Sequence, residues 1–244
     1  ANLAMNKCDL MINVGARFDD RVTGRLDAFS PDSVKFHIDI DQSSINKNVK
    51  VDFHTNTDIT LTLKEINSFI ESNNIELEKK DYTNWWGQIN DWRKKECLHY
   101  EQGEEIIKPQ HAISRLYDLT TQKDTFITTE VGQHQMWAAQ YYKFSKPNRW
   151  ITSGGLGTMG FGMPAAVGAQ MANPDSLVID IAGEASFLMN IQEIATAVQY
   201  KLPIKIFILN NEYMGMVRQW QEHLHGSRYS ESYVEALPDF KKLA

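Results

Sequence analysis

The stretch from Gly183 to Asn211 constrains the fold more than any other part of the chain. A strand-like segment ends at Ile181, and the turn Gly183-Glu184-Ala185-Ser186 follows it. An amphipathic run, the apolar segment 204–209 and the pair Asn210-Asn211 come next. This order places a carboxylate and an amide at the ends of two neighbouring parallel strands. Open α/β sheets bind a diphosphate and its divalent metal at such an edge.

The alternation of strand and helix extends over the whole second half of the chain. Apolar, β-branched segments predict strands at 125–129, 150–152, 177–181 and 204–209. Helical patterns lie between or before them, at 111–119, around 135–137, at 164–171 and at 191–200. Such an alternation requires a parallel sheet with right-handed crossovers.

The first part of the chain repeats the pattern on a smaller scale. Segments 10–14 and 35–40 predict buried strands that end in Gly15 and in Asp39-Ile40-Asp41, as in a nucleotide-binding unit. Residues 76–108 are polar, with three tryptophans spaced along one helix face, and predict a linker and entry helix. We therefore predict an α/β protein with two doubly wound parallel-sheet domains, at 1–75 and 109–244.

Composition excludes several classes of function. The chain has 244 residues and a formal net charge of -6, without a basic cluster that would indicate nucleic acid or a membrane surface as partner. Its apolar runs are too short to span a bilayer. Cys8 and Cys97 lie far apart, without metal-ligand spacing, which favours a reducing cytoplasm.

Both ends of the sequence suggest a longer protein. The chain begins at Ala1 and quickly enters a predicted strand, and it stops at Ala244, shortly after residues 239–242, which predict a new helix. We therefore expect an internal fragment of a longer enzyme, with the domain at 109–244 truncated at its C-terminus. The mass of the native product tests this expectation.

The turn after Ile181 has the chemistry of a metal–diphosphate site. Backbone N–H groups of Ala185 and Ser186, at a helix start, attract phosphate oxygens. Glu184 would repel a bare diphosphate and is better suited as a ligand to a bridging Mg²⁺, with an amide oxygen from Asn211 and a backbone carbonyl as further ligands. Either half alone is typical of an ordinary turn. Together, in one βαβ context, they favour the metal site.

Several motifs carry a family resemblance. Gly183-Glu184-Ala185, with 24 residues before Asn210-Asn211, resembles the thiamine-diphosphate signature, although that signature has Asp where this chain has Glu184. Residues 131–140 (Val-Gly-Gln-His-Gln-Met-Trp-Ala-Ala-Gln), 154–160 and 214–220 resemble the large subunit of acetohydroxyacid synthase (acetolactate synthase). Residues 15–24 match the FAD-domain motif of that family.

The resemblance implies a role for each matching residue. The implied Mg²⁺ ligands are Glu184, Asn211 and, through its backbone carbonyl, Tyr213. The implied contacts to thiamine diphosphate, with Ser186 using its hydroxyl as well as its N–H, come from Gln133, His134, Gly157, Met159, Ala185, Ser186, Met214, Gly215 and Met216. The implied contacts to FAD come from Gly15, Ala16, Arg17, Asp39 and Ile40, so that 1–75 would be a partial central FAD-binding domain.

Four of these positions are implied to act in catalysis. The Gly157 carbonyl would accept a hydrogen bond from the aminopyrimidine, and Met159 would wedge under the cofactor to bend it. Trp220 would shape the pocket for the second 2-oxo acid, and Arg21 would face the substrate entrance. Without the resemblance, the methionine and tryptophan side chains are equally typical of packing and Arg21 of a surface ion pair.

The implied reaction decarboxylates pyruvate and joins the two-carbon unit to pyruvate or 2-oxobutyrate, giving 2-acetolactate or 2-aceto-2-hydroxybutyrate for branched-chain amino acids. The implied assembly is a homodimer or larger, with the active site at the subunit interface and a small regulatory subunit. The family's activating glutamate lies in an N-terminal domain that no segment here matches. We therefore expect the isolated chain to bind cofactor with little turnover, and Glu184 to alter metal affinity.

Two other readings stay open. One is another thiamine-diphosphate carboligase or a pyruvate oxidase relative, which the motif around Arg21 and the Gln219-Trp220 pair argue against. The other is a non-catalytic nucleotide-binding or interaction module. Acetate or hydrogen peroxide as products would favour the oxidase, and a lack of Mg²⁺-dependent cofactor affinity would favour the module.

Overall fold

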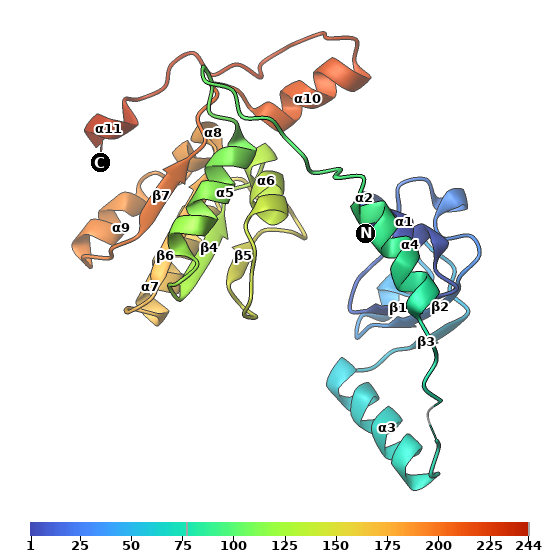
Figure 1. Ribbon diagram of the computed structural model, residues 1–244. Helices are drawn as coiled ribbons and strands as arrows, with labels where there is room; N and C mark the ends of the chain where they lie inside the picture. The colour runs from blue at the N-terminus through green and yellow to red at the C-terminus, as the bar shows by residue number, and fades with distance from the viewer. Residues whose placement is uncertain (77, 244) are drawn as a thin grey trace. The chain divides into compact units, whose positions relative to one another are not determined.

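The computed structural model describes residues 1–76 and 78–243. Leu77, within the predicted linker, and Ala244, the last residue of the predicted second domain, lie outside the described residues. The chain divides into two compact units, residues 1–97 and 98–244 (Figure 1). Each unit is described by itself.

The first unit is built on a three-stranded parallel sheet in the order β1-β2-β3. Ile12 of β1 is in register with Phe36 of β2, which in turn is in register with Phe53 of β3. The strands and helices of this unit are α1 (Asn2–Lys7), β1 (Leu10–Val14), α2 (Asp20–Thr23), β2 (Val34–Ile38), β3 (Phe53–Thr55), α3 (Ile59–Ser72) and α4 (Thr83–Arg93), with 3-10 helices at Leu26–Ala28 and Gln42–Ser44.

Two details of this unit differ from the sequence prediction. The second strand was predicted to reach Ile40, but β2 ends at Ile38, because Asp39 turns its carboxylate onto the Asp41 N–H at 2.8 Å and Ile40 is 74% exposed. The strand β3 and the helix α3 were not predicted. The start of α3 is fixed by Asp58, whose carboxylate accepts the N–H groups of the first turn.

The second unit contains a four-stranded parallel sheet in the order β5-β4-β6-β7. Its strands are β4 (Thr125–Thr129), β5 (Trp150–Thr152), β6 (Leu177–Ala182) and β7 (Lys205–Ile208). Its helices are α5 (Pro109–Thr120), α6 (Gln133–Tyr141), α7 (Gly162–Ala172), α8 (Glu184–Leu188), α9 (Glu193–Gln199), α10 (Gly215–Leu224) and α11 (Phe240–Leu243). The predicted parallel α/β fold is confirmed.

Helices cover both faces of this sheet, as Figure 1 shows for α5 and α6 on one side and α7 and α9 on the other. Neighbouring residues of β4 face opposite layers. Ile127 packs with Ile113 of α5 and Ala138 of α6. Phe126 packs with Ala166 and Ala169 of α7. All five residues of β4 are buried, so this strand shows no alternation of buried and exposed positions.

The strand order reverses beside β4. The chain passes from β4 outward to β5 and then returns to β6 on the other side of β4. In open α/β sheets, ligands bind outside the carboxyl ends of the strands at such a switch point. The fold therefore directs attention to the segments that follow β4 and β6.

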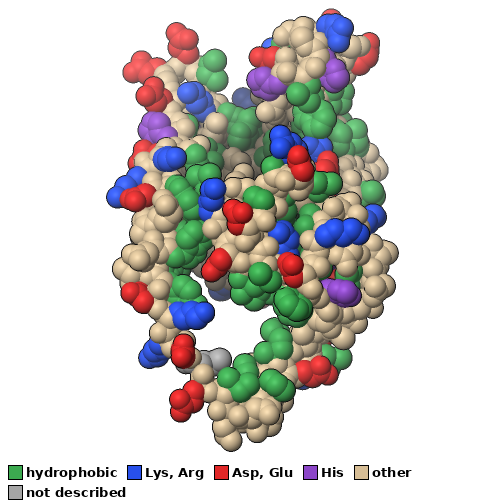
Figure 2. Space-filling view, turned by 90° about the vertical axis from the view of Figure 1, so that its right-hand side faces the viewer, with side chains coloured by type: hydrophobic (Ala, Val, Ile, Leu, Met, Phe, Trp, Pro, Cys, Tyr) green, Lys and Arg blue, Asp and Glu red, His purple; other side chains and the backbone are tan. Residues whose placement is uncertain are grey.

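The surface carries charges of both signs. Lys and Arg side chains are interspersed with Asp and Glu side chains on the face shown in Figure 2. A surface of mixed sign produces no extended field of one sign. Within the described residues, no helix combines the length and the hydropathy needed to cross a membrane.

Candidate functional site

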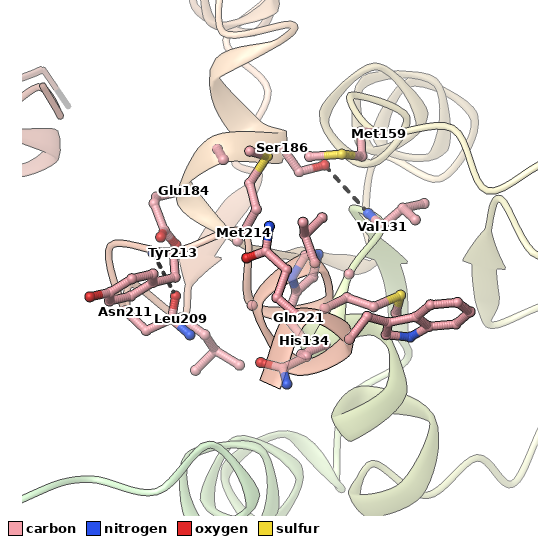
Figure 3. Close-up of a pocket in the computed structure, with 18 of the residues that line it drawn as sticks. Val131, His134, Met159, Glu184, Ser186, Leu209, Asn211, Tyr213, Met214 and Gln221 are labelled. Carbon is pink, nitrogen blue, oxygen red and sulfur yellow. Dashed lines mark hydrogen bonds between the residues drawn. The ribbon is translucent and has the colours of Figure 1, made fainter. Parts of the chain in front are cut away.

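A cavity of about 700 Å³ opens at the carboxyl ends of β4, β6 and β7. The segments that follow these three strands form its walls, together with the Gly-rich loop before α7 and the inner face of α10. Figure 3 shows Glu184, Asn211 and Tyr213 on one side of the cavity, with Val131, Met159 and Ser186 across from them. The cavity therefore lies at the switch point of the sheet.

The structure brings all the predicted site residues of this unit together around the cavity. They come from four stretches of sequence, 133–134, 157–159, 184–186 and 211–220, and their shared property is that each lines this one space. The residues are Gln133, His134, Gly157, Met159, Glu184, Ala185, Ser186, Asn211, Tyr213, Met214, Gly215, Met216 and Trp220.

His134 lines the cavity as a buried, neutral imidazole. Burial lowers its pKa to about 4, against the opposing effect of the Glu130 backbone carbonyl. Its Nε2 is buried and has no hydrogen-bond partner among the described residues. A neutral imidazole has one N–H donor and one acceptor. A buried nitrogen without a partner is costly in a folded protein, and it indicates that a ligand completes the site.

Two glycines permit close packing beneath the cavity. Gly183 has φ −98°, a value that any residue adopts, so the backbone conformation does not require a glycine here. A Cβ at this position would instead collide with the His134 ring. At Gly215 a Cβ would lie 2.2 Å from Oε1 of Gln133, so this position also has no space for a larger residue. Gln133 is held by a 3.0 Å hydrogen bond from its Nε2 to Gln219.

Glu184 places a nearly inaccessible carboxylate at the same edge. The residue is 1% exposed, and its Oε1 has no hydrogen-bond partner within the part of the chain that the structure describes. Burial raises its pKa, and the backbone N–H groups of residues 211–213 oppose that rise. A buried carboxylate oxygen without a partner is the kind of group that a cation satisfies.

Asn211 and Tyr213 form the loop that faces this carboxylate. The Asn211 side-chain oxygen accepts the Tyr213 N–H at 3.1 Å. Tyr213 also forms an isolated antiparallel bridge with Tyr233. The described residues contain no cluster of three or more His, Cys, Asp or Glu that could hold a metal. A metal here therefore depends on one carboxylate, amide and carbonyl oxygens, and oxygens from its ligand, which is a set typical of Mg²⁺.

Sequence reasoning missed Glu130, the residue that directly follows β4. It is fully buried, and its carboxylate accepts hydrogen bonds from the Ser186 hydroxyl and from the N–H groups of Gly160 and Met163. The only local signal was an ionisable residue directly after a wholly buried strand.

Sequence reasoning also missed part of the α10 wall and the segment after it. Val217, Trp220 and Gln221 share one face of α10, at the i, i+3, i+4 spacing that the sequence contained. The Gln221 Nε2 donates to the Ser230 carbonyl at 2.7 Å, while its buried Oε1 has no partner among the described residues. His225 and Arg228 complete the cavity lining.

The predicted site residues of the first unit lie where β1 and β2 end. Gly15 follows β1 with φ +63°, and its N–H donates to the Ile38 carbonyl at 2.8 Å. Asp39 is 8% exposed and follows β2, next to the exposed Ile40. Ala16 follows Gly15 in the same loop, where its carbonyl accepts from Asn13. Arg17 pairs with Asp19 at 3.4 Å, and Arg21 lies in the short helix α2.

Comparison with known proteins identifies two family models along the chain. Residues 1–66 match the central domain of thiamine pyrophosphate enzymes. Residues 130–244 match the C-terminal TPP binding domain of the same enzymes. The second match begins at Glu130 and contains every strand-end segment of the cavity.

Curated relatives match over the whole chain. The chain is 46% identical over 244 residues to the acetolactate synthase isozyme 3 large subunit of Escherichia coli (strain K12), covering 100% of this chain and 42% of that protein. It is 43% identical to the acetolactate synthase large subunit of Haemophilus influenzae, with the same two coverages. It is 44% identical to the chloroplastic acetolactate synthase 1 of Nicotiana tabacum, covering 100% of this chain and 37% of that protein.

Proposed function

Because this chain belongs to the thiamine pyrophosphate enzyme family, as a homologue of acetolactate synthase large subunits, we propose that it forms part of an acetohydroxyacid synthase. The proposed reaction decarboxylates pyruvate and joins the two-carbon unit to a second pyruvate or to 2-oxobutyrate. The chain spans 42% of the length of the first two relatives, so the activity is proposed for the whole protein that contains it.

The observation that carries the proposal is a buried carboxylate oxygen without a partner among the described residues, Glu184 Oε1, beside the backbone N–H groups of Ala185 and Ser186 in the same cavity. The carboxylate oxygen is suited to a cation and the backbone N–H groups to phosphate oxygens, so together they fit a metal-bound diphosphate. When bound, thiamine diphosphate supplies the electron sink that loss of carbon dioxide requires. Around it, the protein binds, orients and excludes water.

The cavity residues divide this work. Gln133, His134, Ala185 and Ser186 would hold the diphosphate, and Mg²⁺ would be held by Glu184, Asn211 and the Tyr213 carbonyl. Gly157 and Met159 would position the rings of the cofactor, with Met214, Gly215 and Met216 as the opposite wall. A neutral His134 adds no charge to the apolar surroundings.

Substrate selection is proposed for Trp220 and Arg21. Trp220 lines the cavity from α10, where a bulky indole limits the size of the second 2-oxo acid. Arg21 belongs to the first unit, and a guanidinium is the side chain best suited to a substrate carboxylate. Both roles are those that the family resemblance implies for these two residues.

For the first unit we propose FAD as ligand, contacted by Gly15, Ala16, Arg17, Asp39 and Ile40. In this proposal residues 1–75 are part of the central domain, 76–108 are the linker and entry helix, and 109–244 are the cofactor domain. A parallel sheet with a positive-φ glycine after its first strand supports nucleotide binding here.

The proposed assembly is at least a homodimer with a small regulatory subunit, since the relatives carry the name large subunit. A cytoplasmic location is part of the proposal and is favoured by the two free cysteines, Cys8 and Cys97.

The test uses the full-length protein that contains this chain. Calorimetric titration with thiamine diphosphate should show binding that depends on Mg²⁺. Incubation with pyruvate and 2-oxobutyrate should give acetohydroxy acids. Acetate or hydrogen peroxide as the main product would contradict the proposed synthase, and a lack of cofactor binding by the folded protein would contradict the proposed site.

A further inference from the structure

The buried carboxylate of Glu130 lies at the meeting point of four segments that build the cavity. Its Oε2 accepts the Gly160 N–H at 2.7 Å and the Ser186 hydroxyl at 2.8 Å, and its Oε1 accepts the Met163 N–H at 3.0 Å. Glu130 itself is 0% exposed and directly precedes Val131. One side chain therefore joins the ends of β4 and of the Gly-rich loop to the starts of α7 and α8.

The hydroxyl of Ser186 is saturated by these contacts. A hydroxyl has one donor and two acceptor sites. The Ser186 proton is donated to Glu130, while its oxygen accepts the Gly160 N–H at 3.2 Å and the Val131 N–H at 3.4 Å. Figure 3 shows the contact with Val131 running across the top of the cavity. The hydroxyl thus has no site left for a phosphate oxygen.

The Gly-rich loop is fixed from both sides at Gly160. Its N–H is bound by Glu130, and its carbonyl accepts from Nδ2 of Asn190 at 2.6 Å. The residue has φ +84°, and an added Cβ would lie 2.7 Å from the same Asn190 nitrogen. The loop that carries Gly157 and Met159 therefore ends at a point whose position depends on Glu130.

We propose that Glu130 is a positioning residue of the diphosphate site, which holds the Ser186 hydroxyl in the protein so that Ser186 meets the ligand only through its main chain. The inference rests on the proposed function, because it takes the diphosphate of thiamine diphosphate as the ligand. It differs from the role that the family resemblance implies, in which the Ser186 hydroxyl itself contacts the diphosphate. Hydrogen bonds to a carboxylate in a buried setting are strong and depend on one another, so removing either partner loosens both segments.

A double-mutant cycle on cofactor affinity tests this in the full-length protein. Glu130→Gln and Ser186→Ala should each raise the Kd of thiamine diphosphate about tenfold, as expected for a lost hydrogen bond to a charged group. The double variant should also show a rise of about tenfold, because both changes break the same contact. If Ser186 binds the phosphate directly, the two effects multiply to about a hundredfold, and the inference is overturned. Unchanged affinity in both single variants overturns it as well.

Thiamine itself, which lacks the diphosphate, separates positioning from general loosening. The Kd of thiamine should rise less than that of thiamine diphosphate in both variants, and an equal rise for the two ligands would contradict the inference. Should Glu130→Gln fail to fold, Glu130→Asp keeps the charge but shortens the reach, and the same cycle is run with it.

A matched control lies in α9, away from the cavity. There the Thr196 hydroxyl donates a 3.0 Å hydrogen bond to the Glu193 carboxylate. Glu193→Gln and Thr196→Ala should leave both Kd values unchanged. If the unmodified protein binds no thiamine diphosphate, the proposed function fails, and this inference fails with it. The same cycle measured on unfolding free energy then still reports the Glu130–Ser186 contact, so that the failure is assigned to the ligand and not to the geometry.

Discussion

Gly183 lies so close to His134 that a Cβ on the glycine would be 2.7 Å from Nδ1 and 2.9 Å from Cε1 of the imidazole. The backbone conformation at Gly183 is open to any residue, so the glycine is required by the neighbour and not by the turn. The histidine is buried and cannot move aside into solvent. The position of the imidazole at the cavity is thus compatible with glycine, and not with a larger residue, at position 183.

Gly183→Ala should therefore displace His134 and weaken binding of thiamine diphosphate. Overpacking of this kind costs about 1–3 kcal/mol, and a loss of about 1.4 kcal/mol in binding corresponds to a tenfold rise in Kd. Calorimetry measures the Kd, and thermal unfolding measures the stability. Gly168→Ala is the matched control, because this exposed glycine in α7 has nothing within 4 Å of an added Cβ. It should leave the Kd unchanged and stabilise the helix slightly.

The His134–Gly183 contact also shows what the sequence did and did not reveal. The end of β4 at Thr129 was predicted correctly, and the end of β6 was predicted one residue early, at Ile181 instead of Ala182. With the strands placed, the turn residues after them had to gather at one edge, and they do. The requirement for glycine at position 183 was not predictable, because it comes from contact with the His134 ring, 49 positions earlier in the chain.

Other misses have the same physical origin. Glu130 reads locally as a turn residue, and its role depends on Ser186, which follows 56 positions later. The strand β3 (Phe53–Thr55) has three residues, too few for a periodic signal. The helical face of α10 was present in the sequence, but residues 214–220 were interpreted only as a motif of the pocket.

The buried Asp180 predicts a distinct dependence of stability on pH. Burial and the charge of Glu130 raise its pKa to about 8, against a hydrogen bond from Thr128. Between its unfolded pKa near 4 and about 8, the native state holds a proton that the unfolded state has lost. The contribution of this group is therefore fully present at low pH and is lost as the pH rises, by about 1.4 kcal/mol per pH unit.

Asp180→Asn should remove this dependence. The amide oxygen can keep the bond that Thr128 donates at 3.0 Å, and the amide stays neutral at every pH. The free energy of unfolding, from urea titrations between pH 5 and pH 8, should fall less steeply than in the unmodified protein. Asp175→Asn, at an exposed position, should leave the slope as it was. An unchanged slope in Asp180→Asn would show that the carboxylate is already charged in the folded state.

We predict that Glu184 sets how strongly cofactor binding depends on Mg²⁺. Glu184→Gln keeps the shape of the side chain but removes the charge whose Oε1 now has no partner among the described residues. The Mg²⁺ concentration for half-maximal cofactor binding should rise at least about tenfold. Chelation of the metal should abolish cofactor binding in the unmodified protein.

Two further variants test the length and the charge of the Glu184 side chain separately. Glu184→Asp tests whether the length of the side chain is matched to this loop, and it should bind Mg²⁺ more weakly than Glu184 if the loop is set for the longer reach. Glu235→Gln, at an exposed position, controls for loss of one negative charge. Equal Mg²⁺ dependence in Glu184→Gln and in the unmodified protein would remove Glu184 from the proposed metal ligands.

Arg218 connects the loop at residues 211–213 to the segment that follows α10. Its guanidinium lies 4.0 Å from the ring centroid of Tyr213 and 5.4 Å from that of Tyr229. The two segments are also joined by backbone bonds from Met214 to Ser232 and from Val234 to Glu212, at 2.8 and 2.9 Å. Stacking of this kind needs a planar cation, so that lysine is a poor replacement.

Arg218→Lys should therefore loosen the loop that carries the Tyr213 carbonyl, although the charge is kept. A cation–π contact contributes about 0.5–2 kcal/mol, so the Mg²⁺ requirement for cofactor binding should rise by about two- to thirtyfold. Arg115→Lys is the control, since Arg115 forms an exposed ion pair with Asp118 in the same unit and should not alter the Mg²⁺ requirement. If Arg218→Lys binds Mg²⁺ like the unmodified protein while Arg218→Ala does not, charge rather than stacking holds the loop. If neither variant changes the requirement, the backbone bonds between the two segments are sufficient to position Tyr213.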